Sequence, residues 1–336
     1  MPTRFRLKPL GEQVVLITGA SSGIGLTTAR MAARRGARVV LVARSEAPLR
    51  QLEEEINDAG GQALAVVADV GNEDDVRRAA EAAVTRFGGI DSWINDAGIS
   101  IYGKLTQIPP DEHHRLFQTN FWGVVHGSLV AVGYLKGRGG GALINVGSTL
   151  SDRAIPIQGM YSASKHAVKG FTDALRMELE ADNAPISVTL IKPGSINTPF
   201  PRHAKNHMGA EATLPPPVYA PDVVADAILH CCENPQRDVL VGGGGKAISS
   251  MGTIAPRLTD YFMEKTLIRG QQKDAPPARR DALFGPSNDL SERGDYDGHT
   301  RETSTYTRAA LHPLITGGIL LAAGVAAAAL FSSRDD

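Results

Sequence analysis

One stretch near the start of the chain decides its fold: Val14-Val15-Leu16-Ile17-Thr18-Gly19-Ala20-Ser21-Ser22-Gly23-Ile24-Gly25. Residues 14–17 form a short, continuous apolar run, which is typical of a strand buried on both faces of a parallel sheet. Three glycines spaced Gly-x-x-x-Gly-x-Gly follow, and residues 26–35 after them have helical character. A strand, a glycine-rich turn and a helix in this order present backbone N–H groups and the positive end of a helix to phosphates. The stretch therefore predicts a dinucleotide-binding unit, whereas the glycine spacing alone would be a weak signal.

The alternation of strand and helix continues along the chain. Further strands are expected at residues 38–43, 63–68, 90–94, 142–146, 186–191 and 238–241. Helices are expected between them, including one long helix over residues 111–134. Alternation with short connections predicts an α/β fold built on a parallel, doubly wound sheet. Ligands of such sheets bind beyond the carboxyl ends of the strands, and most of the motifs lie at such ends.

The second expected strand ends in Ala43-Arg44-Ser45. An NAD-binding unit carries an acid about 20 residues beyond the glycines, where it accepts hydrogen bonds from the ribose 2′-hydroxyl. Ala43 is uncharged at this place, and Arg44 with Ser45 can hold a 2′-phosphate through a charge-assisted contact. We therefore expect a preference for NADP(H). The alternative is that Arg44 is only a surface residue at a strand end.

A second motif, Tyr161-Ser162-Ala163-Ser164-Lys165, opens a helix in the second half of the chain. Residues four apart on a helix share a face, so the phenol of Tyr161 and the ammonium of Lys165 are expected to lie one turn apart. A free phenol titrates near pH ~10, and a neighbouring positive charge lowers that pKa. Such a pair can donate and accept a proton, although on its own it is more often two solvated side chains.

Together the motifs resemble those of the short-chain dehydrogenase/reductase family over residues 10–245. The matching pieces are Thr18-Gly19-x-x-x-Gly23-x-Gly25, Asp69, Asn95-x-Ala97-Gly98, Asn120, Ser148, Tyr161-x-x-x-Lys165 and Pro193-Gly194 with Thr198. Each piece is short, but their joint order and spacing are specific. The resemblance implies a Rossmann-type domain of about seven parallel strands with three helices on each face. Asp96 departs from the family pattern, which usually has a second asparagine there, and we expect it to change the turn only slightly.

The resemblance also implies roles for individual residues. Tyr161 would transfer a proton at the substrate oxygen while hydride moves to or from the nicotinamide, and Lys165 would lower the pKa of Tyr161 and hold the nicotinamide ribose. Ser148 would hydrogen-bond the substrate oxygen, and Asn120 would hold a water that relays protons to Lys165. The expected cofactor contacts are Gly19, Ser21, Ser22, Gly23, Ile24, Gly25, Arg44, Ser45, Asp69, Val70, Asn95, Ala97, Gly98, Tyr161, Lys165, Pro193, Gly194, Ile196 and Thr198.

Composition argues against several other functions. The chain has 336 residues, 42 % of them hydrophobic, and a net charge of −1, which gives no support to nucleic-acid binding. Its two cysteines, Cys231 and Cys232, are adjacent and are expected to be small buried residues in a reducing compartment. His203 and His207 have no evident third ligand, so no metal site is expected. Residues 1–10 are expected to form an N-terminal arm, and they lack the apolar core of a secretory signal.

Beyond residue 245 the resemblance ends. Residues 246–270 are expected to form a helical extension, and residues 271–313, which are rich in Pro, Gly, Asp and Arg, a flexible linker. Residues 314–331 are 18 residues without a charge, and a helix of that length spans ~27 Å, near the thickness of a bilayer core. We expect a transmembrane anchor, with the preceding arginines keeping the enzyme domain in the cytoplasm. The alternative is a helix buried against a partner subunit.

These features predict an NADP(H)-dependent oxidoreductase that interconverts a carbonyl and an alcohol. A membrane anchor would bring the enzyme to apolar substrates such as lipids or steroids, and residues 199–221 are expected to close over the substrate as a lid. The resemblance implies a homodimer or homotetramer. The rival hypothesis is a catalytically silent NADP-binding sensor or scaffold, and the complete set of Ser148, Tyr161 and Lys165 argues against it.

Overall fold

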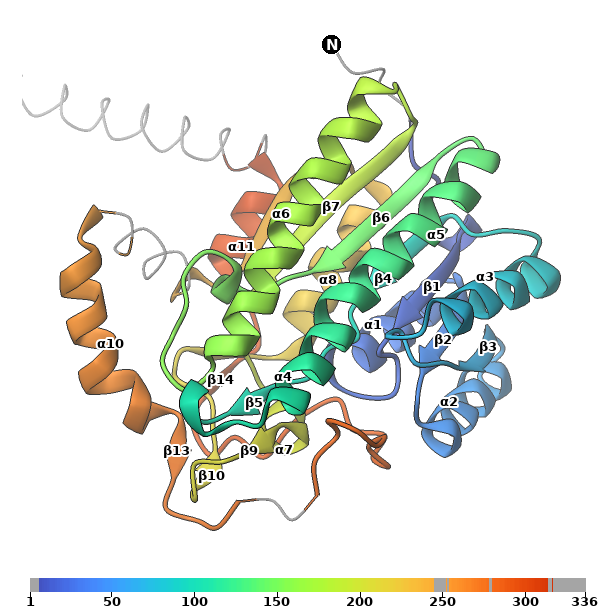
Figure 1. Ribbon diagram of the computed structural model, residues 1–336. Coiled ribbons are helices and arrows are strands. Elements are labelled where there is room, and N and C mark those ends of the chain that lie inside the picture. Colours follow the sequence, from blue (N-terminus) through green and yellow to red (C-terminus); the bar gives the residue numbers. More distant parts are fainter. Residues whose placement is uncertain (1–5, 245–251, 253, 278–279, 314–315, 317–336) are drawn as a thin grey trace, which may run out of the picture.

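The computed structural model describes residues 6–244, 252, 254–277, 280–313 and 316, and it centres on one parallel sheet (Figure 1). The sheet has seven strands in the order β12-β7-β6-β4-β1-β2-β3. Their bounds are β1 Val14–Thr18, β2 Arg38–Ala43, β3 Gln62–Val67, β4 Ser92–Asn95, β6 Gly141–Val146, β7 Ile186–Pro193 and β12 Asp238–Val241. Every neighbouring pair is parallel, so the carboxyl ends of the strands meet at one edge. The predicted doubly wound, seven-stranded sheet is confirmed.

Three helices cover each face of the sheet (Figure 1). One face carries α1 Gly23–Arg34, α2 Glu46–Asp58 and α8 Pro221–Glu233; the other carries α3 Glu73–Phe87, α5 Gly123–Gly137 and α6 Gly159–Ala181. Side chains of a strand alternate between faces. Val15 and Ile17 of β1 therefore join the core cluster on the first face, and Val14 and Leu16 join the cluster on the second. Burial on both faces explains the continuous apolar run of this strand.

The long helix expected over residues 111–134 is interrupted. It consists of α4 Pro110–Phe117, a π-helical turn Gln118–Trp122, and α5. Single π-helical turns within α-helices are frequently found at functional sites. Asn120 lies in this turn and is fully buried. An asparagine that is unfavourable in a regular helix is thus placed where the helix is irregular.

Short elements at the carboxyl edge of the sheet join segments that are distant in sequence. Pairs form between β5 Ile101–Tyr102 and β9 Lys205–Asn206, between β10 Glu211–Ala212 and β13 Gln272–Lys273, and among β8 Ser195–Ile196, β11 Val218–Tyr219 and β14 Thr300–Arg301. Further helices among the described residues are α7 Phe200–His203, α10 Pro256–Gly270 and α11 Thr305–Leu311, with 3₁₀ turns at Leu10–Glu12, Leu105–Gln107 and Thr149–Ser151. The region expected as a lid, residues 199–221, therefore contains α7, β9, β10 and β11.

The described part of residues 271–313, expected to be a flexible linker, packs on the domain built around the seven-stranded sheet instead. It contributes β13, β14 and α11, and the side chains of Leu283 and Leu311 are 0 % and 6 % exposed. The expectation rested on the scarcity of large apolar residues. The segment is held mainly by strand pairing, backbone hydrogen bonds and ion pairs, which leave little trace in hydrophobic patterning.

The apolar segment 314–331, expected to be a transmembrane helix, lies outside the described residues apart from Thr316. Within the part of the chain that the structure describes, none of the helices combines the length and the apolar character needed to cross a bilayer.

Cys231 and Cys232 are buried in α8 as free thiols, as expected.

Candidate active site

A cavity of about 310 Å³ lies at the carboxyl edge of the sheet. Most of the residues expected to bind the cofactor or the substrate line it: Gly19, Ser21, Ser22, Gly23, Ile24, Arg44, Ser45, Val70, Ala97, Gly98, Ser148, Tyr161, Lys165, Pro193, Gly194, Ile196 and Thr198. Four expected residues do not line it: Gly25, Asp69, Asn95 and Asn120. The sequence motifs thus come together at one place, while the role of each residue stays a prediction.

The glycine turn between β1 and α1 is built on close backbone approach. Gly19 and Gly23 have φ of +77° and +54°, a region that side chains with a Cβ rarely adopt. A Cβ on Gly25 would lie 2.3 Å from the carbonyl oxygen of Gly19. Gly25 therefore acts from outside the cavity, because only a residue without a side chain lets the start of α1 sit this close to the end of β1.

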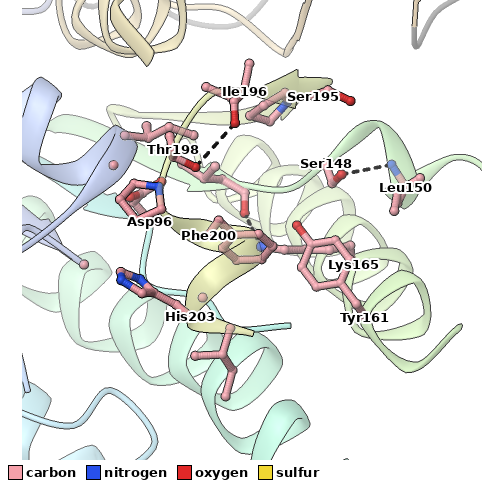
Figure 2. A pocket seen from close by; sticks show the side chains of 18 of the residues that line it. Asp96, Ser148, Leu150, Tyr161, Lys165, Ser195, Ile196, Thr198, Phe200 and His203 are labelled. Carbon is pink, nitrogen blue, oxygen red and sulfur yellow. Dashed lines mark hydrogen bonds between the residues drawn. The ribbon is translucent and has the colours of Figure 1, made fainter. Parts of the chain in front are cut away.

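Ser148, Tyr161 and Lys165 project into the same part of the cavity (Figure 2). Ser148 caps the 3₁₀ turn after β6, and its Oγ accepts a hydrogen bond from the N–H of Leu150 at 3.1 Å. Tyr161 and Lys165 lie in the first half of α6, and the Lys165 Nζ is 5.7 Å from the centre of the Tyr161 ring. Lys165 Nζ also donates to the carbonyl oxygen of Val146 at 2.8 Å. The ring of Phe200 packs against the Tyr161 ring in an edge-to-face arrangement, and the two ring centres are 5.6 Å apart.

The expected lowering of the Tyr161 pKa is not the dominant effect in this arrangement. Burial raises the pKa of the Tyr161 phenol, and a hydrogen bond with Ser148 opposes this shift. Burial also lowers the pKa of Lys165 to about 8, against the attraction of Asp96 for the charged ammonium. The low polarity of the cavity disfavours both charged forms. Tyr161 is therefore held as a protonated phenol, which is a proton donor.

Asn120 braces the wall of the cavity. Its side-chain Oδ1 accepts from the N–H of Ile99 at 2.8 Å, and its Nδ2 donates to the carbonyl oxygen of Ile99 at 2.9 Å and to Ser164 Oγ at 3.2 Å. These contacts tie the chain after β4 to α6, the helix that carries Tyr161 and Lys165. The water relay implied by the family resemblance stays a prediction.

Asn95 and Asp69 likewise hold backbone and side chains in place. Asn95 is buried in a network with Trp93 Nε1, Ser128 and Asn145 that links β4 to β6 and α5. Asp69 accepts from the N–H of Gly71 at 2.9 Å and from Arg115 at 2.6 Å. Both residues therefore hold other residues in place at the carboxyl edge of the sheet, and neither lines the cavity.

Asp96 has a larger place in the site than the sequence suggested. It lines the cavity, and its carboxylate accepts a hydrogen bond from the backbone N–H of Gly25. Burial raises the pKa of the Asp96 carboxyl to about 7, while Lys165 and the Gly25 N–H pull it down. The departure from asparagine therefore adds a titratable group between the glycine turn and Lys165. The departure itself was the only signal in the sequence.

Arg44 and Ser45 lie at the end of β2, as expected, but the tail of the chain already occupies their donors. Arg44 donates to the carbonyl oxygen of Ala282 and at 3.4 Å to those of Leu283 and Phe284. Ser45 Oγ donates to the carbonyl oxygen of Ser287. Burial lowers the pKa of Arg44, and the positive charge of Arg115 lowers it further. Sequence reasoning missed these contacts because it placed the tail away from the domain.

The two histidines near α7 each meet a carboxylate. His203 Nε2 is 2.8 Å from Asp289, and His207 Nε2 is 2.7 Å from Glu112. Burial lowers the pKa of His203, against the attraction of Asp289 for the protonated ring. No group of three potential metal ligands occurs among the residues described.

Comparisons with known proteins agree with the geometry. A family model for short chain dehydrogenases matches residues 13–209. An uncharacterised oxidoreductase of Bacillus subtilis, YxnA, is 44 % identical over 322 residues, which cover 95 % of this chain and 90 % of that protein, so the match extends beyond residue 245. A 3-ketodihydrosphingosine reductase of Bacteroides thetaiotaomicron is 37 % identical over 188 residues, 56 % of this chain and 65 % of that protein.

Solved structures share the fold. L-sorbose reductase of Gluconobacter frateurii, complexed with NADPH and L-sorbose, matches with a TM-score of 0.61 and 26 % identity over 69 % of this chain and 95 % of that one. Other similar structures hold NAD or NADH.

Replacing Asp96 by Asn is expected to stabilise the fold more at pH 8 than at pH 5. The unfolded carboxyl titrates near ~3.9, while burial raises the folded pKa to about 7. Between these values the folded state keeps a proton that the unfolded state has lost, so the free energy of unfolding falls as pH rises. Asparagine does not titrate, and its carbonyl oxygen can still accept from Gly25.

The measurement is the Tm of both proteins from pH 5 to pH 8. If the Tm of Asp96→Asn exceeded that of the wild type by the same amount at every pH in this range, the result would contradict an Asp96 carboxyl that stays protonated in the folded state.

Proposed function

The chain belongs to the short-chain dehydrogenase/reductase family, and on that premise we propose that it uses NADP(H) to reduce an apolar ketone or aldehyde. Family membership makes it an oxidoreductase of carbonyl and alcohol groups. The observation that carries the proposal is the meeting of Ser148, Tyr161 and Lys165 with the glycine turn in one cavity. A protein that only binds the dinucleotide has no need of all three side chains.

The glycine turn fits a dinucleotide. Gly19, Gly23 and Ile24 line the cavity where the glycine turn leads into α1, and the N–H groups and dipole at the start of a helix favour phosphate. A Cβ on Gly23 would lie 3.1 Å from the Cβ of Thr198, so the bare backbone leaves room there that a side chain would fill. The cofactor, when bound, supplies the hydride.

The protein's own groups would then handle the substrate oxygen and its proton. Ser148 Oγ and the Tyr161 hydroxyl would each donate a hydrogen bond to the carbonyl oxygen of the substrate, which would polarise the carbonyl. Tyr161 would give its proton to the forming alkoxide. Lys165, with its pKa lowered to about 8 by burial, would favour the phenolate that remains by its positive charge. A phenol that burial keeps protonated suits the reductive direction.

The preference for NADP(H) rests on charge at the end of β2. Arg44 lies near a second guanidinium, that of Arg115, whose charge lowers the Arg44 pKa. A 2′-phosphate would relieve this repulsion and could accept charge-assisted hydrogen bonds from Arg44. Ala43 offers no carboxylate to a free ribose 2′-hydroxyl. Similar structures hold NADPH in one case and NAD or NADH in others, so the proposed preference rests on Arg44 and Ala43.

The apolar substrate is proposed from the walls of the cavity. Its side chains beyond Tyr161 include Leu150, Ile155, Phe200, Leu214 and Leu267. A similar reductase acts, by its name, on 3-ketodihydrosphingosine, which supports a lipid-like ketone. Anchoring of the enzyme through residues 314–331, and its assembly as a homodimer or homotetramer, remain parts of the same proposal. The rival function is a silent NADP-binding sensor.

Replacing Tyr161 by Phe is expected to lower kcat for ketone reduction by ~10²–10⁴-fold, because the proton donor is lost. The Kd for NADPH should change by less than about threefold, since the ring remains in place. Tyr134→Phe, on α5 and packed against the core, is the matched control and should keep wild-type turnover. Turnover of a ketone panel by Tyr161→Phe at the wild-type rate would rule out the proton-donor role. Wild-type protein that binds NADPH but turns over nothing would favour the sensor.

Replacing Arg44 by Ala is expected to raise the Kd for NADPH by ~10–100-fold, the value of one charge-assisted phosphate contact. The Kd for NADH should not rise, because NADH has no 2′-phosphate for Arg44 to hold. Isothermal titration of both cofactors measures this, with Arg50→Ala on the exposed face of α2 as control. Equal weakening of both cofactors would contradict a 2′-phosphate site at Arg44.

A further inference from the structure

Residues 281–294 of the tail lie across the cofactor side of the cavity. The backbone N–H of Gly23, in the glycine turn, donates to the carbonyl oxygen of Ser291 at 2.9 Å. Ser45 Oγ donates to the carbonyl oxygen of Ser287, and Arg44 donates to the carbonyl oxygens of residues 282–284. Ala282, Pro286 and Ser287 form part of the cavity wall. This segment therefore contacts both the glycine turn and the end of β2.

The donors that the tail uses are those expected to hold phosphate groups. A phosphate oxygen and a carbonyl oxygen are both acceptors, and the Gly23 N–H and the Ser45 hydroxyl each have a single hydrogen to donate. Neither donor can serve the tail and a phosphate fully at once. Arg44 has five N–H groups, and its two terminal nitrogens already donate to three carbonyl oxygens of the tail.

We propose that residues 281–294 are a strap that occupies the phosphate-binding donors of the groove, so that the dinucleotide must displace it in order to bind. The proposal rests on the proposed NADP(H) function and adds a regulation of the same site. The strap is a built-in competitor whose carbonyl oxygens take the place of phosphate oxygens.

The strap is held by side chains as well as by its backbone. Asp289 lies 2.8 Å from His203, and Glu292 lies 2.9 Å from Arg30 of α1. Leu283 is fully buried in a cluster that includes Tyr161, and its carbonyl oxygen accepts from Arg115 at 3.1 Å. The strap is therefore seated at its start, its middle and its end.

The two competitors differ in kind, which makes displacement feasible. Carbonyl oxygens carry no net charge, whereas a 2′-phosphate brings negative charge to Arg44 and Arg115 and forms stronger hydrogen bonds. The strap's advantage is its tether, because β13 and β14 attach the chain on either side of it and keep its local concentration high. The apparent Kd for the cofactor then equals the intrinsic Kd divided by the fraction of molecules with an open groove.

The direct test is hydrogen–deuterium exchange of the full chain with three ligands, measured separately. These are NADPH, 2′,5′-ADP, which carries a 2′-phosphate and a 5′-phosphate, and adenosine, which carries no phosphate. Saturation is established separately by isothermal titration. We expect backbone amides of residues 281–294 to exchange about tenfold faster or more with NADPH and with 2′,5′-ADP, and at the unliganded rate with adenosine. Slower exchange of these amides, or unchanged exchange when NADPH saturates the protein, would overturn the proposal that the dinucleotide displaces the strap.

A second test loosens the strap without touching the donors. Asp289→Asn combined with Glu292→Gln replaces the two carboxylates that contact His203 and Arg30, and the Kd for NADPH is expected to fall ~3–10-fold with kcat within twofold of wild type. Asp226→Asn combined with Glu73→Gln makes the same change in net charge on the outer surface, at ion pairs with Arg35 and Arg77. Equal tightening in this control would assign the effect to overall charge and overturn the proposal.

The tests separate the strap from the proposed function. Tight NADPH binding with an unmoved segment would reject the strap and keep the NADP(H) function. NADPH binding by the loosened variant but not by wild type would support both. No binding of NADPH by either protein would reject both.

Discussion

The site depends on the close contact between the start of α1 and the end of β1. Gly25 sits so near Gly19 that a single added carbon would lie 2.3 Å from its carbonyl oxygen. This contact aims the first N–H groups of α1 at the cavity, where they are left without partners inside the helix. Such donors must be satisfied by something, and their partner at Gly23 is a carbonyl oxygen of the strap. The glycine turn therefore creates both the affinity for phosphate and the need for a substitute when none is bound.

A second constraint is the low polarity of the cavity, which holds three titratable groups close together. Burial shifts the pKa of Tyr161 and Asp96 upward and that of Lys165 downward, so each group is driven toward its neutral form. A neutral phenol can donate a proton only if the charge left behind is stabilised. The ammonium of Lys165 can do this, whereas an ionised Asp96 would oppose it. The carboxyl at position 96 thus couples the charge of the site to pH in a way that an asparagine would not.

Much of the fold and part of the site could be predicted from the sequence. The seven strands follow from apolar runs, and the meeting of Ser148, Tyr161 and the glycine turn follows because parallel strands place their carboxyl ends at one edge. The π-turn at Asn120 could not be predicted, because it depends on tertiary hydrogen bonds to Ile99 and Ser164. The rise that burial causes in the Tyr161 pKa could not be predicted either. The motif shows that a cation lies one helical turn away, but it does not show which apolar residues surround the phenol.

The tail shows most clearly where sequence patterns fail. Hydrophobic periodicity detects segments that fold by burying side chains, but the strap buries few and binds through main-chain carbonyls, which every residue has. Its fit lies in the spacing of those carbonyls relative to Arg44, Ser45 and Gly23, which no residue type reveals. A segment with a low content of apolar residues can therefore be ordered wherever the surface it meets has unsatisfied donors. A phosphate-binding groove is such a surface, because its donors are arranged for an anion and stay exposed until an acceptor arrives.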